Sequence, residues 1–226
     1  MTIRPRAVVA VVGTGTDVGK TWVAAAVVPC LLAAGRRVSV RKPVQSFAAA
    51  DRATDAQLLA ATTGEDPRRV CSSRRAYPLA MAPPIAARHL GRPPIALRDL
   101  VAELQWPEGV DIGLVETVGG VRSPMADDGD SATFVTAIAP DHVLLVADAG
   151  LGAINLVRLS AHAVEPFPTT VMLNRFDGDN PVHNTNRGWL ADRDGFTVVT
   201  TVDECALMML RLVPLGGNEA GGRLPG

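Results

Sequence analysis

Residues 11–28 read VVGTGTDVGKTWVAAAVV, and this stretch decides the fold. An apolar, β-branched run stops at glycine and an apolar stretch with helical spacing follows, which predicts a strand, a Gly-rich turn and a helix. Gly19, Lys20 and Thr21 match the end of the common phosphate-binding loop, G-x-x-x-x-G-K-[ST]. The first glycine of that pattern would fall at position 14, but the sequence has Thr14 between Gly13 and Gly15.

A strand, turn and helix in this order would bind phosphate. The turn directs backbone N–H groups and the positive end of a helix dipole at one point. Lys20 adds a positive charge for the outer phosphates, and Thr21 offers a hydroxyl to Mg²⁺. An ordinary strand-to-helix turn would not need a lysine at the helix start, where its charge opposes the dipole. We therefore expect a phosphate-binding role.

The rest of the chain alternates between strand-like and helix-like segments. Strands are expected at 7–13, 37–44, 112–116, 142–148, 169–174 and 196–202, and helices at 20–35, 53–64 and 154–164. The alternation predicts one α/β domain over residues 1–226, with a mostly parallel sheet and helices on both faces. The phosphate-binding loop at its start makes the expected fold P-loop NTPase-like. Pro29 is a candidate for a helix kink. Residues 66–96 predict a loop with one short helix, and 214–226 a flexible tail.

Bulk properties narrow the class of protein. The 226 residues have a formal net charge of −1 and no run of Lys or Arg, which gives no support to nucleic-acid or membrane-surface binding. The N-terminal apolar run is too short to span a membrane and lacks a signal-peptide cleavage pattern. The cysteines lie far apart without a CxxC pair, so we expect reduced thiols in a cytoplasmic protein. The histidines share no metal-ligand spacing.

The shifted glycine becomes informative when the loop is compared with known patterns. GTGTDVGKT (13–21) resembles the G-T-x-T-x-V-G-K-T loop of dethiobiotin synthetases, in which the first glycine also lies one residue early. Further segments resemble that family in the same order: RKPVQS, ATDAQLL, MAPPIAARHLG, LVETVGGVRSPMAD, ADAGLGAINLVRLSA and VMLN. The loop together with RKPVQS is the specific combination, and the matches run from residue 7 to 176.

The resemblance implies an ATP-dependent ligase of biotin biosynthesis. Such an enzyme joins CO₂ to 7,8-diaminopelargonic acid and gives dethiobiotin, ADP and phosphate. One amine traps CO₂ as a carbamate, the γ-phosphoryl group of ATP converts the carbamate to a mixed anhydride, and the second amine closes the ring. The implied ligands are ATP, CO₂ or bicarbonate, the diamine and Mg²⁺. A homodimer with active sites near its interface is also implied.

The resemblance also assigns roles to individual residues. Lys42 follows the second expected strand, where sites of parallel sheets form, and would neutralise the carbamate and the transferring phosphoryl group; the alternative is a surface lysine before a proline. Lys20 and Thr16 complete the implied catalytic set. The implied nucleotide contacts are Asp17, Val18, Gly19, Lys20, Thr21, Trp22, Asp55, Glu116, Gly119 and Asn174. We expect the Trp22 indole to pack rather than to stack on a base, while Asn174 either bonds the base or is a turn residue.

Metal and substrate contacts form a second group of candidates. Mg²⁺ prefers hard oxygen ligands, and the candidates are Thr21, Asp55 and Glu116. Asp148 also ends an expected strand and competes with Glu116 on position alone, while Asp55 could be a solvated helix residue. The resemblance assigns Thr16 and Ser46 to the amine or carbamate end of the diamine. The same resemblance places the carboxylate of the diamine at a helix N-terminus of the other subunit, formed by Gly152, Ala153 and Asn155.

Two departures from the family pattern keep rival functions open. Thr117 and Val118 replace Gly and Ala, and β-branched residues would be strained there if the backbone needed a positive φ. The family's Pro after the last strand is missing from FTVVTTVDECA, which leaves the nucleobase preference open. The rivals are a cobyrinate-type amide synthetase, whose glutaminase domain we expect to be absent, and a partitioning-type switch ATPase, whose extra loop lysine is missing. A paralogue with another amine or without turnover is the third.

Overall fold

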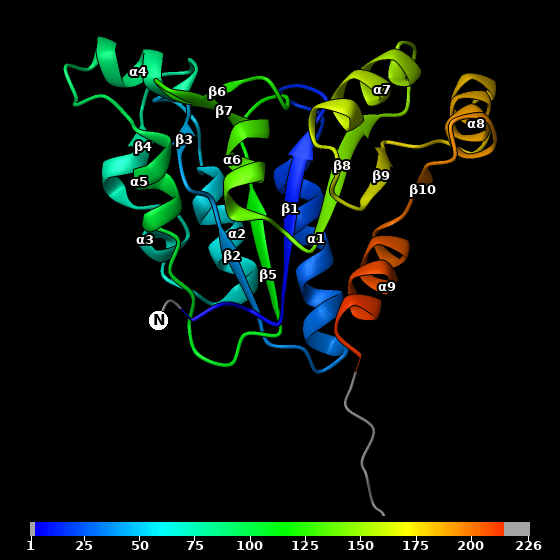
Figure 1. Ribbon diagram of the computed structural model, residues 1–226, viewed down its shortest axis with the longest axis horizontal. Coiled ribbons are helices and arrows are strands. Elements are labelled where there is room, and N and C mark those ends of the chain that lie inside the picture. Colours follow the sequence, from blue (N-terminus) through cyan, green and yellow to red (C-terminus); the bar gives the residue numbers. More distant parts are fainter. Residues whose placement is uncertain (1–2, 215–226) are drawn as a thin grey trace, which may run out of the picture.

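The protein, described over residues 3–214 in a computed structural model, is built on one sheet of six strands. They are β1 (Ala7–Gly13), β2 (Val38–Arg41), β5 (Ile112–Glu116), β8 (His142–Asp148), β9 (Thr169–Asn174) and β10 (Thr197–Val199). Their order is β10-β9-β8-β1-β5-β2, and every neighbouring pair is parallel (Figure 1). The predicted α/β fold with a parallel sheet is confirmed.

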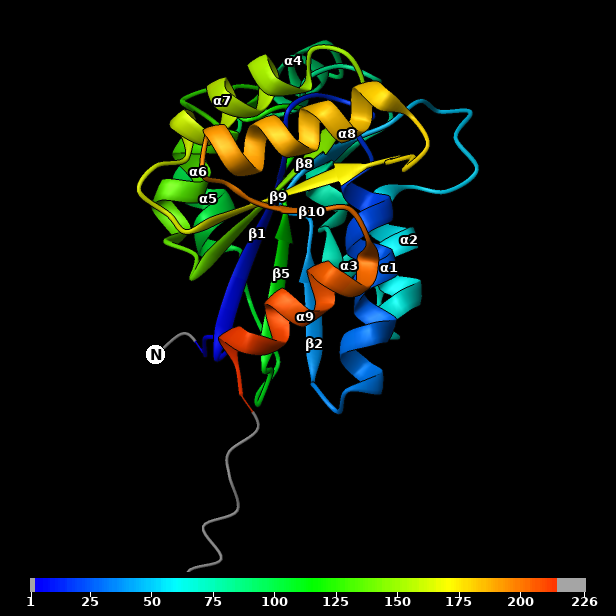
Figure 2. The same cartoon turned by 90° about the vertical axis from the view of Figure 1, so that its right-hand side faces the viewer.

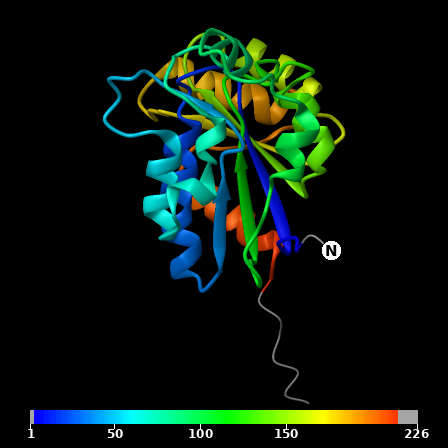
Figure 3. The ribbon, with the colours of Figure 1, turned by 90° about the vertical axis from the view of Figure 1, so that its left-hand side faces the viewer.

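Helices cover both faces of the sheet, as the alternation of elements predicts. One face carries α1 (Lys20–Ala33), α2 (Asp55–Thr63), α3 (Pro67–Val70) and α9 (Val202–Leu212). The other carries α4 (Pro83–His89), α5 (Leu97–Ala102), α6 (Ser131–Ile138), α7 (Ala153–Ala163) and the π-helical turn η2 (Trp189–Arg193), which follows α8 (Pro181–Gly188). The two layers are visible in Figures 2 and 3, where the blue and cyan helices stand on one side of the strands and the green helices on the other.

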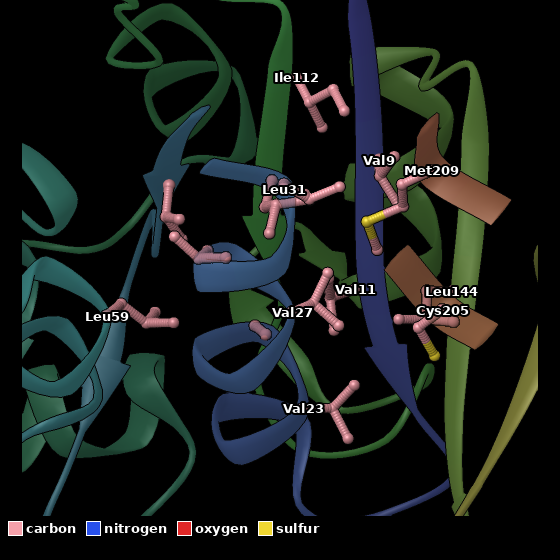
Figure 4. Close-up of a cluster of buried hydrophobic side chains, with 14 of the residues drawn as sticks. Val9, Val11, Val23, Val27, Leu31, Leu59, Ile112, Leu144, Cys205 and Met209 are labelled. Atoms are coloured by element: carbon pink, nitrogen blue, oxygen red, sulfur yellow. The ribbon is translucent and has the colours of Figure 1, made fainter. Parts of the chain in front are cut away.

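The core between β1 and α1 shows why these segments adopt their structures. Val9 and Val11 lie two residues apart on β1, so both point to the same face of the sheet. Val23, Val27 and Leu31 lie four residues apart on α1 and form one side of the helix. All five are fully buried against one another (Figure 4). This packing fixes the start of α1 relative to the end of β1 and thereby positions the loop between them.

The end of α1 agrees with the sequence analysis. Gly35 has a left-handed φ of 75°, its N–H donates to Leu32 O at 2.9 Å, and the N–H of Arg36 donates to Leu31 O at 3.1 Å. These two bonds form a Schellman motif, which closes helices at a glycine. The helix is continuous through Pro29.

The strand expected at 196–202 is too long, because its last residues begin a helix. β10 ends at Val199 and α9 starts at Val202. Thr201 Oγ1 accepts the N–H of Glu204 at 3.2 Å, and the Glu204 carboxylate accepts the N–H of Thr201 at 3.1 Å. This reciprocal pair is a capping box, which marks the start of a helix. The β-branched residues before it favour a strand, so the sequence pattern predicted a strand that continues too far.

The region 66–96 contains more structure than the loop and single helix that we expected. Besides α4 it holds α3, the 3₁₀ turn η1 (Ser73–Arg75) and strand β4 (Ala76–Tyr77), which pairs with β3 (Gln45–Ser46). Asp66 caps α3 by accepting the N–H of Arg68 at 2.8 Å. A short antiparallel pair, β6 (Pro124–Ala126) and β7 (Gly129–Asp130), precedes α6. Short elements of this length carry too little periodicity to be read from the sequence.

Three further expectations concern the thiols, membrane spans and the tail. Cys30, Cys71 and Cys205 are all free, and burial raises the pKa of the Cys71 and Cys205 thiols to about 12. Within residues 3–214, no helix is long and apolar enough to cross a membrane. The expected tail at 214–226 lies outside the described residues from position 215 onward.

Candidate active site

The phosphate-binding loop explains why a glycine stands at position 13. A Cβ at Gly13 would lie 2.9 Å from Lys20 Cδ and 3.0 Å from Lys20 Nζ. The lysine side chain therefore occupies the space that a larger residue would fill. Lys20 Nζ donates to Gly15 O at 2.8 Å and to Gly119 O at 2.7 Å. Gly13 thus allows Lys20 to lie back over the loop, with its charge at the carboxyl end of β1.

The start of α1 leaves donors available for an anion. Gly19 is the N-cap in the left-handed region, with φ 94°, and no side chain caps the helix. The first N–H groups of a helix have no intrahelical partners, and they carry the positive end of the dipole. The arrangement agrees with the phosphate-binding role expected from Gly19, Lys20 and Thr21.

Lys42 is the centre of a buried charged cluster. Its residue directly follows β2, and its side chain is 3% exposed. Nζ contacts Glu116 Oε1 and Asp55 Oδ2, the latter at 2.8 Å, and donates to Thr117 O at 3.2 Å. The alternative of a surface lysine is wrong. Thr21 Oγ1 donates to the same Glu116 Oε1 at 2.8 Å, so the cluster adjoins the phosphate-binding loop.

The charges in this cluster set its protonation states. Burial lowers the pKa of Lys42, but the carboxylates of Glu116 and Asp55 outweigh it and hold that pKa above its ordinary value. Burial alone would raise the pKa of Asp55, yet the Lys42 charge keeps it below its usual range. Burial raises the pKa of Glu116 despite Lys42. Burial, with the Lys42 charge as the second cause, lowers the pKa of Lys20 to about 8. Lys42 is therefore a fixed cation, while Lys20 remains mostly protonated at neutral pH.

The predicted magnesium ligands converge in this cluster. Thr21, Asp55 and Glu116 supply one hydroxyl and two carboxylates, the hard oxygen donors that Mg²⁺ prefers. Glu116 Oε2 is buried without a hydrogen-bond partner among the described residues, and it is free to act as a ligand. The same residues contain no cluster of three or more His, Cys, Asp or Glu side chains placed to hold a metal ion by themselves. A site of two carboxylates and a hydroxyl therefore fits an ion that takes its remaining ligands from phosphates and water.

Asp148, the competitor of Glu116, lies in a different set of contacts. Its Oδ2 pairs with Arg175 Nη1 at 2.9 Å, and its Oδ1 accepts the N–H of Gly150 at 2.9 Å. The same arginine donates to Asp17 O at 2.6 Å. Asp17 and Arg175 both have positive φ, 60° and 56°, although neither is glycine. Arg175 therefore ties the phosphate-binding loop to the ends of β8 and β9, a role that the sequence analysis missed.

The departure at Thr117 and Val118 does not strain the backbone. Neither residue has a positive φ; the left-handed residue of the segment is Gly119, with φ 54°. Thr117 is fully buried, and its N–H donates to Val11 O at 3.0 Å, which extends the pairing of β5 with β1. A Cβ at Gly120 would lie 3.1 Å from Thr14 O, so this segment approaches the loop closely. The two β-branched residues therefore stand where side chains fit.

A cavity of about 510 Å³ opens beside the start of α1. Its wall comes from the loop, the end of β9 and the β10–α9 connection: Gly19, Trp22, Met172, Asn174, Arg175, Phe176, Thr200, Thr201 and Val202. Trp22 is 58% exposed, so the expected packing of its indole is at most partial. Asn174 is buried and donates its amide to Val18 O at 2.9 Å, so it supports the loop as well as lining the cavity.

The candidate substrate residues lie in two places. Thr16 is exposed on the loop, with Oγ1 3.6 Å from the Cβ position of Gly119, and Ser46 donates to Met81 O. Gly152 is the N-cap of α7 with φ 90°, Ala153 is buried behind it and Asn155 is exposed. Within residues 3–214, no hydrogen bond or ion pair joins the start of α7 to the buried charged cluster around Lys42. The structure thus brings together the nucleotide and metal candidates, whereas the α7 residues form a separate group.

Comparison with known proteins shows the family of the chain. A family model described as an AAA domain, AAA_26, matches residues 7–204. The ATP-dependent dethiobiotin synthetase BioD of Haloferax mediterranei is 34% identical over 196 residues, 84% of this chain and 82% of the relative. That of Streptomyces coelicolor is 38% identical over 155 residues, 68% of this chain and 64% of the relative. The chain therefore spans slightly less than two thirds of the Streptomyces protein.

Solved structures support the fold. The signal recognition particle receptor FtsY of Elizabethkingia anophelis superposes with a TM-score of 0.53 at 18% identity, over 86% of this chain and 58% of that chain. A plasmid partition protein of Borrelia burgdorferi, bound to AMPPNP, gives a TM-score of 0.53 at 12% identity, over 94% and 93%. At such identities these likenesses show the P-loop fold and no more. With the family model and the curated relatives, the finding is plain: this chain belongs to the ATP-dependent dethiobiotin synthetase family.

Proposed function

We propose that this chain catalyses the ATP-dependent carboxylation and ring closure of 7,8-diaminopelargonic acid in the cytoplasm, with dethiobiotin, ADP and phosphate as products. The observation that carries the proposal is Lys42. It is a buried cation held between two carboxylates, and Thr21 of the phosphate-binding loop bonds one of those carboxylates, so its charge lies beside the place where phosphates would bind. Neutralising a carbamate and a transferring phosphoryl group uses that charge.

The residues divide the chemistry between binding and charge neutralisation. One amine of the diamine attacks CO₂ and loses a proton, which gives a carbamate that Lys42 and Thr16 orient. A carbamate oxygen attacks the γ-phosphorus while Lys20 and the loop N–H groups hold the phosphates, and ADP leaves. The second amine then attacks the carbonyl carbon and expels phosphate, which closes the cyclic urea. Mg²⁺, held by Thr21, Asp55 and Glu116, would supply charge neutralisation at the phosphates.

The proposal includes a homodimer that completes the substrate site. The start of α7 would bind the distant carboxylate of the diamine through Gly152, Ala153 and Asn155 of the neighbouring subunit. Support comes from exposed leucines on and before this helix: Leu151 is 96% exposed, Leu156 44% and Leu159 63%. Apolar side chains that cluster on one exposed helix are typical of protein interfaces.

Replacing Leu159 by aspartate is expected to convert the dimer to a monomer, because the new charge would be buried without a partner. Sedimentation velocity measures the change. Leu207→Asp is the matched control, since Leu207 is 56% exposed on α9, on the other face of the sheet. A wild-type monomer, or a Leu159→Asp variant that still sediments as a dimer, would contradict this interface.

The activity itself is tested by omitting one component at a time. We expect release of phosphate from ATP only when Mg²⁺, bicarbonate and diaminopelargonate are all present, because the phosphoryl acceptor is the carbamate and not water. Phosphate release and dethiobiotin formation, followed by mass spectrometry, should agree one to one. Removal of Mg²⁺ with a chelator should stop both.

The rival functions predict different outcomes in the same assay. ATP hydrolysis without the diamine, stimulated by a protein or a lipid surface, would indicate a partner-binding switch ATPase. Nucleotide binding without turnover would indicate a paralogue that uses another amine or has lost activity. Either result would overturn the proposed reaction while leaving the family assignment intact.

A further inference from the structure

Gln45 links the segment that carries Lys42 to the helix that carries Asp55. Its side chain is buried, and its Oε1 accepts the N–H of Ala56 at 3.0 Å. Lys42 lies three residues before Gln45, and Asp55 lies directly before Ala56. The ion pair of Lys42 with Asp55, at 2.8 Å, and the hydrogen bond of Gln45 with Ala56 therefore join the same two segments.

The start of α2 depends on partners from outside the helix. The preceding residues 49–53 are all exposed, so the connection to the Lys42 segment runs through solvent. Ala56, Leu59 and Ala60 pack one side of α2 into the core, but the first N–H groups of a helix have no partner within it. Gln45 supplies one of these partners.

The Asp55 carboxylate is not held in place by burial, since its side chain is 38% exposed. Aspartate side chains compete for nearby backbone N–H groups, and the dipole at a helix start attracts them further. The two donors that follow Asp55 are already occupied. The Ala56 N–H bonds Gln45, and the Gln57 N–H donates to Thr54 Oγ1 at 3.3 Å. The carboxylate therefore remains directed at the buried charged cluster.

We propose that Gln45 is a positioning residue for the magnesium site, because it occupies the Ala56 N–H and so keeps the Asp55 carboxylate available as a Mg²⁺ ligand. The inference rests on the proposed binding of Mg²⁺ by Thr21, Asp55 and Glu116. Loss of a group that orients a metal ligand lowers metal affinity by roughly 10- to 100-fold. Since Gln45 acts through Asp55, its loss should weaken nucleotide binding only when Mg²⁺ is present.

The experiment measures the affinity for AMPPNP, a non-hydrolysable ATP analogue, by titration calorimetry in Mg²⁺ and in EDTA. The dissociation constant in EDTA divided by that in Mg²⁺ gives a metal ratio. Gln45→Met keeps the length of the side chain without its acceptor. It should lower the metal ratio by roughly fivefold or more and change the affinity in EDTA by less than about twofold. Gln45→Asn draws the amide oxygen back from Ala56 and should show the same loss, which tests the inference independently of the folding of the methionine variant.

Two further variants separate positioning from a general effect on the helix. Gln57→Met is the matched control, because Gln57 Oε1 accepts the N–H of Thr54 at 2.8 Å and its loss also removes a hydrogen bond at the start of α2. It should lower the urea midpoint but leave the metal ratio unchanged. Adding Gln45→Met to Asp55→Asn should change the metal ratio by less than about twofold, because the carboxylate that Gln45 positions is already gone.

Several results would overturn the inference. They are an unchanged metal ratio in the Gln45 variants, an equal loss of affinity in EDTA, and a full further loss when Gln45→Met is added to Asp55→Asn. Wild-type affinity for AMPPNP that does not depend on Mg²⁺ would refute the proposed metal site together with the inference. Because no turnover is required, wild-type protein that binds AMPPNP with Mg²⁺ but forms no dethiobiotin would refute the proposed reaction alone.

Discussion

Dethiobiotin formation by a Lys42→Met variant is expected to be at least about 10³-fold slower than that of the wild type, with the dissociation constant of MgATP changed by less than about tenfold. The rate falls because Lys42 supplies the buried cation nearest to the developing charge, and methionine keeps its length without its charge. Nucleotide affinity survives because the loop donors remain, and because loss of the Lys42 charge removes one cause of the lowered Lys20 pKa and so leaves Lys20 protonated. Single-turnover kinetics and calorimetric titration separate the two effects.

Stability has to be measured in the same experiment. Removing Lys42 leaves Asp55 and Glu116 close together without their common partner, a change that costs about 3–5 kcal/mol when a buried pair is broken. Protonation of Glu116, whose pKa burial already raises, limits the loss. Urea unfolding gives the folded fraction, to which the rate should be normalised.

Arg41→Met is the matched control for Lys42→Met. Arg41 is the preceding residue, it is also buried, and it pairs with Glu65 at 2.8 Å and stacks on Trp106. Its loss should lower the free energy of unfolding by a similar amount, yet leave the rate per folded molecule nearly unchanged. A Lys42→Met rate within about tenfold of the wild type, or an equal fall in Arg41→Met, would show that Lys42 is structural.

The sequence was sufficient to predict the sheet and the phosphate-binding loop, because both depend on local patterns. Fully buried strands such as β1 appear as continuous apolar runs, and the glycines of the loop mark positions where a side chain would collide. Gly13 is an example, because a side chain at this position would collide with the side chain of Lys20, seven residues later. A pattern of this kind is readable without knowing the three-dimensional structure.

The contacts that hold the site together were less predictable, because they join distant segments. Lys42 and Glu116 are 74 residues apart, and Arg175 meets Asp17 across 158 residues. Only the strand order brings these residues to the same edge of the sheet. Position alone could not separate Glu116 from Asp148, which both end strands; the separation came from β5 and β8 lying on opposite sides of β1.

Replacing Gly19 by alanine is expected to weaken MgATP binding by roughly 30- to 100-fold, which corresponds to about 2–3 kcal/mol. Gly19 has φ 94°, a conformation that alanine adopts only at a cost. A Cβ at this position would also lie 2.1 Å from Asn174 Nδ2. Asn174 would have to leave Val18 O, so the loop would lose its support at the point where it turns into α1. Calorimetric titration with AMPPNP measures the loss.

Two variants divide this effect into its causes. Gly35→Ala introduces alanine at a similar left-handed φ of 75°, but a Cβ there has open space around it, so only about 1 kcal/mol of stability should be lost and no nucleotide affinity. Adding Asn174→Ala to Gly19→Ala removes the collision, and the double variant should bind tripolyphosphate more tightly than Gly19→Ala alone. Tripolyphosphate is the right probe because it has no base for Asn174 to contact. If Gly19→Ala binds as well as the wild type, or if Asn174→Ala restores nothing, then the contact between β9 and the loop does not hold the phosphate site in place.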